Sequence, residues 1–385
     1  MPVARLYLTR ILRIFYALLA LSGSLYAQAM SGLYTGLNAS GSRADANRAA
    51  AALKSNRYLN GVLVGAAWQS LEPAREKYDF SALDRAAAIA REAGKQYKLK
   101  ITPGMYCPRW IYEAGAARLE TLVSNPNRGN YGENALVPIP WDPVYQEHFS
   151  RLIRKLGERY GADPHCVGVT LTCANFMSAE MHLPKRPEDV RKWKEAGLTG
   201  ARLLAVYRKY MDEWAAAFPG RLVCLHMSNS APLPDISPDQ LSEQIVLYGL
   251  EKHARQFALQ SNGLNGRKET EARPGNPILK YKDRLLNGYQ SFASFLTTPQ
   301  RQGGIEMAVL NFVRAGAEYW ELWQADGDDA ATCAKISAAI AEARKLGYEA
   351  YKQKLIRTGL YRRAEDDPWP ELRDKMRAEK DARRK

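Results

Sequence analysis

Short apolar runs alternate with longer amphipathic segments along this chain, and the pattern repeats eight times. Between the apolar runs, hydrophobic residues recur at helical spacing, as they do over Asp142–Gly161. The runs are apolar throughout, as is typical of parallel strands that are buried on both faces. We expect the eight strands at residues 32–39, 61–68, 97–105, 166–173, 221–228, 256–262, 286–292 and 317–324.

Eight strand-then-helix units in one chain predict an α/β fold, a single-domain (β/α)8 TIM barrel. The alternative is an open doubly wound sheet. No G-x-G-x-x-G turn follows the first expected strand, so a dinucleotide-binding sheet of that kind lacks its signature. The length of 385 residues also suits a barrel, because single α/β barrels reach this size with insertions.

The two ends of the chain differ from its middle. The first 29 residues carry three arginines, an apolar run and then Ala27-Gln28-Ala29, a small-x-small cleavage pattern. We interpret residues 1–29 as a signal peptide, so the protein is expected to be secreted or periplasmic, with no stable membrane insertion after cleavage. The alternative is a membrane anchor, but the apolar run is shorter than the roughly 20 residues of a span. Residues 30–360 then form the barrel, and 361–385 a charged C-terminal tail.

The composition is that of an ordinary globular protein, with 46% hydrophobic and 25% charged residues. The formal charge of +14 falls to +11 once the three arginines of residues 1–29 are removed. Acidic residues are interspersed with the basic ones, and no dense basic block occurs, which argues against nucleic acid as a partner. The five cysteines match no metal spacing, so no metal is expected, and they define no disulfide pairing.

Polar and aromatic residues gather after the expected strands. In a barrel of this type, the carboxyl ends of the strands carry the chemistry. Aromatic faces cover the apolar side of a sugar ring, while amides and imidazoles bond its hydroxyl groups. The sequence therefore predicts a carbohydrate site. Its expected substrate contacts are Trp68, Arg109, Trp110, Asn175, His182, Asn229, Asn262 and Gln290.

Two segments resemble a known group of enzymes. WQSLEPAREKYDFSALDRAAAIAREAGKQYKLKI (Trp68 to Ile101) is similar to the second βα unit of clan A glycoside hydrolases of the β-galactosidase and cellulase kind. VPIPWDPVYQEHFSRLIRKLGERYG resembles the helix that precedes their fourth strand. The resemblance implies a TIM barrel that hydrolyses an O-glycosidic bond in an oligo- or polysaccharide. Two carboxyl groups suffice for that reaction, so no cofactor is expected.

The resemblance also implies where the two carboxyl groups lie. In that clan the acid glutamate follows strand four, usually directly after an asparagine, and the nucleophile ends strand seven. Glu180 is the only carboxylate in the strand-four segment, five residues after Asn175, and is the expected general acid. Strand seven has Gln290 at the expected nucleophile position, and an amide cannot act as that nucleophile.

Several hypotheses follow for the second carboxylate. Glu321, on the eighth expected strand, is the best candidate. Strands four and eight lie across the barrel, and a wide carboxyl separation, about 6.5–9.5 Å, favours inversion. Asp326 or Glu269 takes the role if the strand register differs. Alternatively, the barrel binds glycans without cleaving them. A different class of function, binding of anionic polymers, would need basic residues on the rim, where Arg109 is the strong candidate.

Overall fold

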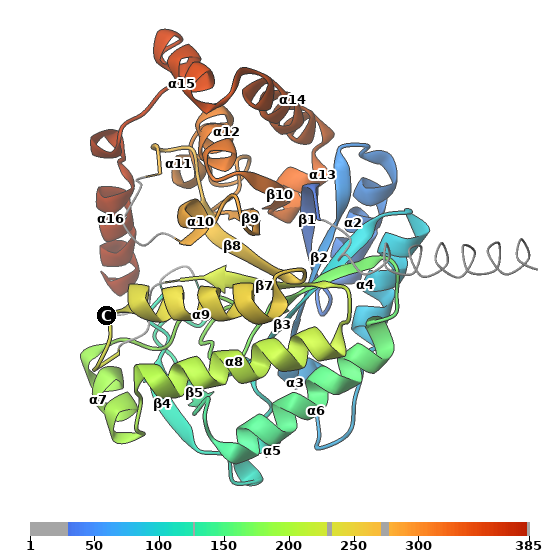
Figure 1. Cartoon of the computed structure of the whole chain (residues 1–385), viewed down its shortest axis with the longest axis vertical. Coiled ribbons are helices and arrows are strands. Elements are labelled where there is room, and N and C mark those ends of the chain that lie inside the picture. The colour runs from blue at the N-terminus through green and yellow to red at the C-terminus, as the bar shows by residue number, and fades with distance from the viewer. Residues whose placement is uncertain (1–29, 126–127, 229–232, 271–276, 383–385) are drawn as a thin grey trace, which may run out of the picture.

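Eight parallel strands form a closed barrel with helices around it in the computed structural model of the chain (Figure 1). The structure describes residues 30–125, 128–228, 233–270 and 277–382. Around the barrel, the strands are Gly32–Asn38 (β1), Leu59–Ala67 (β2), Gln96–Thr102 (β3), Cys166–Leu171 (β6), Leu222–Met227 (β7), Phe257–Leu264 (β8), Leu286–Ser291 (β9) and Ala317–Leu322 (β10). Each expected strand overlaps one of these eight. The predicted (β/α)8 barrel is confirmed.

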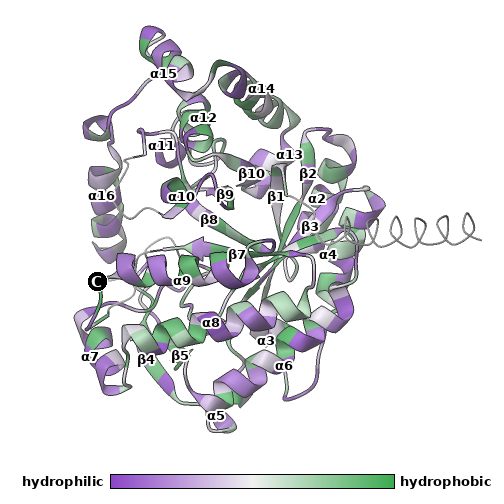
Figure 2. Cartoon of the chain, viewed as in Figure 1, coloured by the Kyte–Doolittle hydropathy of each residue, from purple (hydrophilic) through white to green (hydrophobic). Residues whose placement is uncertain are grey.

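Amphipathic helices cover the outside of the barrel, and Figure 2 shows their hydrophilic residues in purple. In Pro143–Tyr160 (α6), Ile153 and Leu156 are fully buried, whereas Lys155 and Glu158 are exposed. The other α-helices are Arg43–Ser55 (α2), Trp68–Leu71 (α3), Ser81–Glu92 (α4), Trp110–Glu113 (α5), Pro187–Glu195 (α7), Gly200–Ala217 (α8), Pro238–His253 (α9), Pro277–Lys280 (α10), Pro299–Gln302 (α11), Ile305–Arg314 (α12), Gln324–Asp328 (α13), Ala330–Leu346 (α14), Tyr348–Arg357 (α15) and Trp369–Ala382 (α16). Short 3-10 turns occur at Gly104–Tyr106 and Ala364–Asp366.

A hairpin that the hydrophobic pattern did not predict lies in the long loop after β3. Arg118–Leu122 (β4) pairs antiparallel with Asn134–Pro138 (β5). Each strand has only five residues, and in β4 buried Leu119 and Thr121 alternate with exposed residues. A segment this short and half polar gives a weak strand signal. The hairpin extends the carboxyl end of the barrel on the β3 side.

Two tyrosine rings fill the amino-terminal half of the barrel interior. Tyr34 and Tyr319 meet edge to face, with ring centroids 6.2 Å apart. Each ring has room because the strand next to its own carries a glycine: Gly61 on β2 beside Tyr34, and Gly288 on β9 beside Tyr319. A Cβ atom at Gly61 would lie 2.6 Å from Tyr34 Cε1, and one at Gly288 would lie 2.0 Å from Tyr319 Cζ. Because this half is filled, any ligand site inside the barrel has to lie toward the carboxyl ends of the strands.

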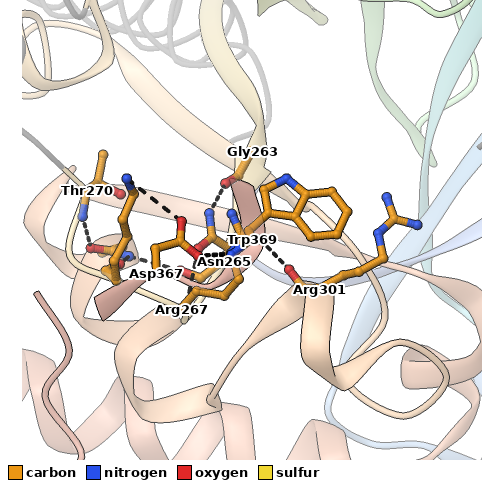
Figure 3. Close-up of polar contacts among 9 residues, drawn as sticks. Gly263, Asn265, Arg267, Thr270, Arg301, Asp367 and Trp369 are labelled. Atoms are coloured by element: carbon orange, nitrogen blue, oxygen red, sulfur yellow. Dashed lines mark hydrogen bonds and ion pairs between the residues drawn. The ribbon is translucent and has the colours of Figure 1, made fainter. Parts of the chain in front are cut away.

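The last described residues, 364–382, form a segment that we call the C-terminal strap. Near its start, Arg267 Nε donates a hydrogen bond to Asp367 Oδ1 at 2.9 Å (Figure 3), and both side chains are almost fully buried. The Trp369 ring lies beside two guanidinium groups, whose carbon atoms are 5.4 Å (Arg267) and 5.1 Å (Arg301) from its centroid. These contacts attach the strap to the loops that follow β8 and β9.

The other end of the strap reaches the opposite side of the barrel. Tyr131, between β4 and β5, donates its hydroxyl hydrogen to Asp381 Oδ1 at 2.7 Å. The strap therefore joins the loops after β8 and β9 to the loop after β3 (Figure 1). The predicted charged tail, residues 361–385, thus contains a docked helix in its described part.

Two predictions concern the ends of the chain and the cysteines. The expected signal peptide, residues 1–29, lies outside the described residues. Within the described part, no helix combines the length and the apolar character that a membrane span requires. The five cysteines all fall in the described part, where each is buried and free.

Candidate active site

A buried polar layer crosses the barrel interior above the two tyrosines. Lys98 on β3 and Glu321 on β10 form an ion pair in this layer, with Nζ 2.6 Å from Oε1. Gln260 on β8 contacts both partners. Its Oε1 accepts a hydrogen bond from Lys98 Nζ at 2.6 Å, and its Nε2 donates one to Glu321 Oε2 at 2.8 Å. Each partner of the ion pair thus also has a hydrogen bond to Gln260, which offsets part of the cost of burying two charges.

His226 on β7 belongs to the same layer. Its Nε2 lies 3.2 Å from Lys98 Nζ and 3.3 Å from Thr170 Oγ1, and its Nδ1 lies 3.3 Å from Asn262 Nδ2. Burial holds the pKa of His226 well below its usual value, and the charge of Lys98 lowers it further. The imidazole is therefore neutral at pH 7 and adds no charge to the layer.

Glu180 lies on the loop after β6, the fourth strand around the barrel. Asn175 holds this loop together, because its Oδ1 accepts a hydrogen bond from Cys173 N and its Nδ2 donates one to Glu180 O, both at 2.7 Å. Met181 N donates to His226 O at 3.0 Å, which attaches the loop to the end of β7. Asn175 is thus a positioning residue for Glu180, although it was predicted to contact the substrate directly.

The loop after β3 packs directly against the Glu180 loop. Met105 N donates a hydrogen bond to Phe176 O at 3.1 Å. Gly104 permits this approach, because a Cβ atom there would lie 2.4 Å from Phe176 O. Its φ of +68° also lies in the region that favours glycine. The loop after β3 therefore holds the backbone of the Glu180 loop in position.

The Glu180 carboxyl group is partly buried and accepts a hydrogen bond from Ser178 Oγ at 3.0 Å. Burial raises its pKa above the usual value, while Ser178, Lys100 and Arg128 oppose that increase. A carboxyl group with a raised pKa keeps its proton closer to neutral pH, which a general acid requires.

His182 lies two residues beyond Glu180. Burial lowers its pKa to about 4, and the charges of Lys185 and Arg128 act in the same direction. Its ring packs edge to face with Phe176, with centroids 6.1 Å apart. At pH 7 this side chain is therefore a neutral hydrogen-bonding group beside the candidate acid.

Four more side chains lie at the carboxyl ends of their strands: Lys100, Asn262, Gln290 and Trp323. Asn262 accepts a hydrogen bond from Gln260 Nε2 at 2.9 Å. Gln290 is the register partner of Glu321, and its amide has no hydrogen-bond partner among the described residues.

Trp323 is 47% exposed. Its Nε1 donates to Ser291 O at 2.9 Å, which anchors the ring. An anchored, exposed indole and a free amide can stack on and bond to a sugar.

Three predicted substrate contacts lie elsewhere. Trp68 is fully buried, and its Nε1 donates to Glu72 Oε2 at 2.9 Å. Trp110 Nε1 donates to Glu72 O at 2.9 Å, and its ring packs against that of Trp68. Arg109 is exposed and lines a surface hollow beside the β4–β5 hairpin. Trp68 therefore has no free face for a sugar, which corrects its expected role. Arg109 lines this hollow beside the hairpin, which does not include Glu180. Predicted Asn229 lies outside the described residues.

Asp326 and Glu269, the two alternatives to Glu321, both form contacts that hold loops and helices together. Asp326 accepts hydrogen bonds from Ser294 Oγ at 2.7 Å and from two backbone amides of the loop after β9. Glu269 forms ion pairs with Arg314 and Lys352 at 2.9 and 2.8 Å. Among the described barrel strands, only β10 brings a carboxylate, Glu321, to the interior.

The sequence contained a signal for three residues that were not predicted. Lys98 and Lys100 alternate in YKLKIT, an otherwise apolar strand, which places both on the interior face. Trp323 follows Glu321 by two residues, directly after the last residue of β10, where the backbone is still extended. Strand alternation applied to charged and aromatic residues points to all three.

Comparisons with known proteins agree with this architecture. Residues 43–210 match the model of glycoside hydrolase family 42, described as beta-galactosidase. The matched segment covers somewhat less than half of the chain and includes β2, β3, β6 and Glu180. Over this segment the chain resembles glycoside hydrolase family 42. The resemblance predicted from the sequence is confirmed.

Two curated relatives are similar over shorter stretches. The beta-galactosidase Bga of Halorubrum lacusprofundi is 31% identical over 106 residues, which are 26% of this chain and 14% of that protein. The beta-galactosidase BglY of Alicyclobacillus acidocaldarius is 32% identical over 127 residues, which are 33% of this chain and 18% of that protein. The match thus spans less than a fifth of the length of either relative.

A solved structure extends the similarity of fold over most of the chain. The cold-adapted beta-galactosidase from Rahnella sp. R3 superposes with a TM-score of 0.51 at 14% identity. The superposition covers 82% of this chain and 57% of that one. At this identity the agreement concerns the fold alone.

Proposed function

We propose that the protein hydrolyses an O-glycosidic bond in an oligo- or polysaccharide, with Glu180 as the general acid. One observation carries this proposal. Glu180 lies after the fourth barrel strand, partly buried, and burial raises the pKa of its carboxyl group. The family match over residues 43–210 supports the reaction class. Asn262, Gln290 and the exposed indole of Trp323 supply sugar contacts around it.

Glu321 is the second carboxylate of this proposal. Glu180 would donate its proton to the glycosidic oxygen as the bond to C1 breaks. A water molecule that attacks C1 would give its proton to Glu321. Lys98 and Gln260 each contact one oxygen of Glu321 and fix the orientation of its carboxyl group. For this step the sugar must bring the water to the inner layer, because the Glu321 side chain is only 1% exposed.

A second function is favoured by a specific observation, namely the occupied oxygens of Glu321. One oxygen is paired with Lys98 and the other accepts a hydrogen bond from Gln260, while Gln290 replaces a carboxylate at the end of β9. A barrel with these features would bind carbohydrate without cleaving it. The Glu180 loop and the Trp323 ring would then act only in recognition.

A hydrolysis screen with oligosaccharides separates the two functions. The wild-type protein is expected to release reducing ends, and Glu180→Gln to lower the rate by a factor of about 10² or more. Glu321→Gln should also lower it. Equal rates for wild type and Glu180→Gln would remove Glu180 as the acid. Binding to the same sugars without any hydrolysis would support the carbohydrate-binding function instead.

We also propose that the protein is exported, on the basis of the arginines, apolar run and Ala-Gln-Ala pattern in residues 1–29. Expression of the full chain and mass spectrometry of the product test this. A mature protein that begins at Met30 and is recovered outside the cytoplasm is expected. An uncleaved, cytoplasmic product would contradict the proposal.

A further inference from the structure

Lys100 lies on the interior face of β3, near the opening of the barrel at the carboxyl ends of its strands, which we call the mouth. It is two residues beyond Lys98, so both side chains point to the same side of the strand. Its register partner on β2 is Gly65, and a Cβ atom there would lie 3.4 Å from Lys100 Cε. The absence of a side chain at Gly65 therefore leaves room for the lysine stem to reach the mouth.

The two lysines differ in their partners. Lys98 has an ion pair with Glu321 and contacts with Gln260 and His226. The Lys100 ammonium group has no hydrogen bond and no ion pair with any described residue, although the side chain is largely buried. Burial lowers the pKa of Lys100, and the charges of Glu321 and Glu180 oppose that change. A partly buried cation without a partner is available to an anion, so this arrangement points to a ligand that completes it.

Arg128 supplies a second cation on the same side of the mouth. Its Nη2 donates to Met177 O at 2.6 Å, and its Nη1 lies 3.4 Å from Tyr106 OH. Among the described residues, no carboxylate lies within ion-pair distance of this guanidinium. Through Met177 this guanidinium contacts the loop that carries Glu180, and its charge opposes the raised pKa of Glu180.

The charges around Glu180 therefore do not balance. Glu321 neutralises Lys98, and both His182 and His226 are neutral at pH 7. Lys100 and Arg128 remain, and when Glu180 carries the proton that it donates as an acid, the mouth has two uncompensated positive charges. A neutral sugar would leave both cations without a counter-charge.

We propose that Lys100 and Arg128 form an anion subsite beside Glu180, and that the glycan bound there carries a carboxylate or a sulfate ester next to the bond at Glu180. This inference rests on the proposed function in that the mouth binds a glycan. It adds the substrate class, acidic sugars. Arg128 offers a planar pair of donors to such a group, and Lys100 a point charge.

Calorimetric titrations in a Glu180→Gln background, which prevents turnover, test the subsite. One arm compares trigalacturonate with its methyl ester, and the other compares a κ-carrageenan oligosaccharide with its desulfated form. The charged member of at least one pair is expected to bind about tenfold more tightly than its neutral counterpart. The two arms distinguish a carboxylate from a sulfate ester.

Three variants assign the preference to its residues. Lys100→Met and Arg128→Gln should each remove most of it, whereas Lys345→Met, on the exposed surface of α14, should retain it. Equal binding of charged and neutral forms in both arms would overturn the inference and leave the proposed function intact. No binding of any probe would overturn both.

Thermal unfolding provides an independent readout for Lys100. Because its ammonium group has no partner among the described residues and its stem is partly buried, Lys100→Met is expected to keep or raise the melting temperature of the free protein. A clear fall in melting temperature would show that Lys100 stabilises the barrel, and would overturn the inference.

Discussion

Lys98 and Glu321 form an ion pair in the middle of the barrel, with the ammonium nitrogen 2.6 Å from a carboxylate oxygen and both side chains at most 1% exposed. They come from β3 and β10, which are not neighbours in the barrel. The pair therefore links two strands across the interior, where most parallel barrels have branched apolar side chains.

Lys98→Met is expected to destabilise the fold by about 3–5 kcal/mol, because Glu321 would stay buried without its counter-charge. The double variant Lys98→Met/Glu321→Gln should recover part of that loss, because it removes the unpaired charge. Urea unfolding of wild type, both single variants and the double variant gives the coupling free energy. Strictly additive losses would contradict the pairing.

Two tryptophans near the end of β10 are expected to differ sharply when replaced. Trp320 is fully buried and stacks on Phe312 with centroids 5.4 Å apart, so Trp320→Ala should cost about 3–5 kcal/mol of stability. Trp323→Ala should leave stability nearly unchanged and weaken glycan binding by about tenfold, through loss of ring stacking. Thermal unfolding and calorimetric titration measure the two effects. A loss of stability without a loss of binding in Trp323→Ala would contradict its role.

The pH dependence of hydrolysis should report on Glu180. A general acid is active only while protonated, so kcat/KM should fall as the pH rises through the raised pKa of this carboxyl group. Lys100 and Arg128 lower that pKa, so Lys100→Met and Arg128→Gln should move the basic limb to higher pH. Lys345→Met serves as the control. If the high-pH decrease in kcat/KM occurs at the same pH in both variants as in wild type, the two cations do not act on the pKa of Glu180, which would contradict the prediction.

His182 should contribute to acid sensitivity of the fold. Its pKa is about 4 in the folded chain, against about 6.5 when unfolded. Between these values the unfolded chain binds more protons, so the contribution is fully present above pH 6.5 and decreases as the pH falls toward 4. His182→Gln is expected to remove up to about 1.4 kcal/mol per pH unit from the slope of stability in that window. Urea unfolding at pH 4.5, 5.5 and 7 measures the slope, and an unchanged slope would contradict the prediction.

The C-terminal strap should detach without unfolding the barrel. Asp367→Asn removes the partner of buried Arg267, and Trp369→Ala removes the ring between two guanidinium groups. Each is expected to speed hydrogen exchange in α16 and around Tyr131, while the melting temperature falls by only a few degrees. Asp374→Asn, on the exposed face of α16, is the control. Equal exchange in the Asp367 and Asp374 variants would show that the anchor is not at Asp367.

The eight strands could be predicted because each is a short apolar run followed by a helical pattern, and their observed bounds differ from the expected ones by only a few residues. The β4–β5 hairpin could not, because five-residue strands with polar outer faces resemble loop sequence. Trp68 shows a second limit. A large aromatic residue at the end of a strand can point to the mouth or into the layer of helices, and local sequence does not decide between them.

The position of Glu180 after the fourth strand could also be predicted, since it depends only on the order of strands. The partners of Glu321 could not. Lys98 and Gln260 are 162 residues apart in the sequence, and only closure of the barrel brings them together around the carboxylate. For the same reason, the lack of a partner at Lys100 becomes visible only once every neighbouring strand is in place.

The tyrosine pair at the amino-terminal end of the barrel has a kinetic consequence. Tyr34 and Tyr319 fill the interior where Gly61 and Gly288 leave space, so no ligand passes through the barrel from one end to the other. Whatever enters at the Glu180 end must leave by the same opening. A new ligand can therefore enter only after the previous one has left. A bound product would compete with substrate for the same opening of the barrel.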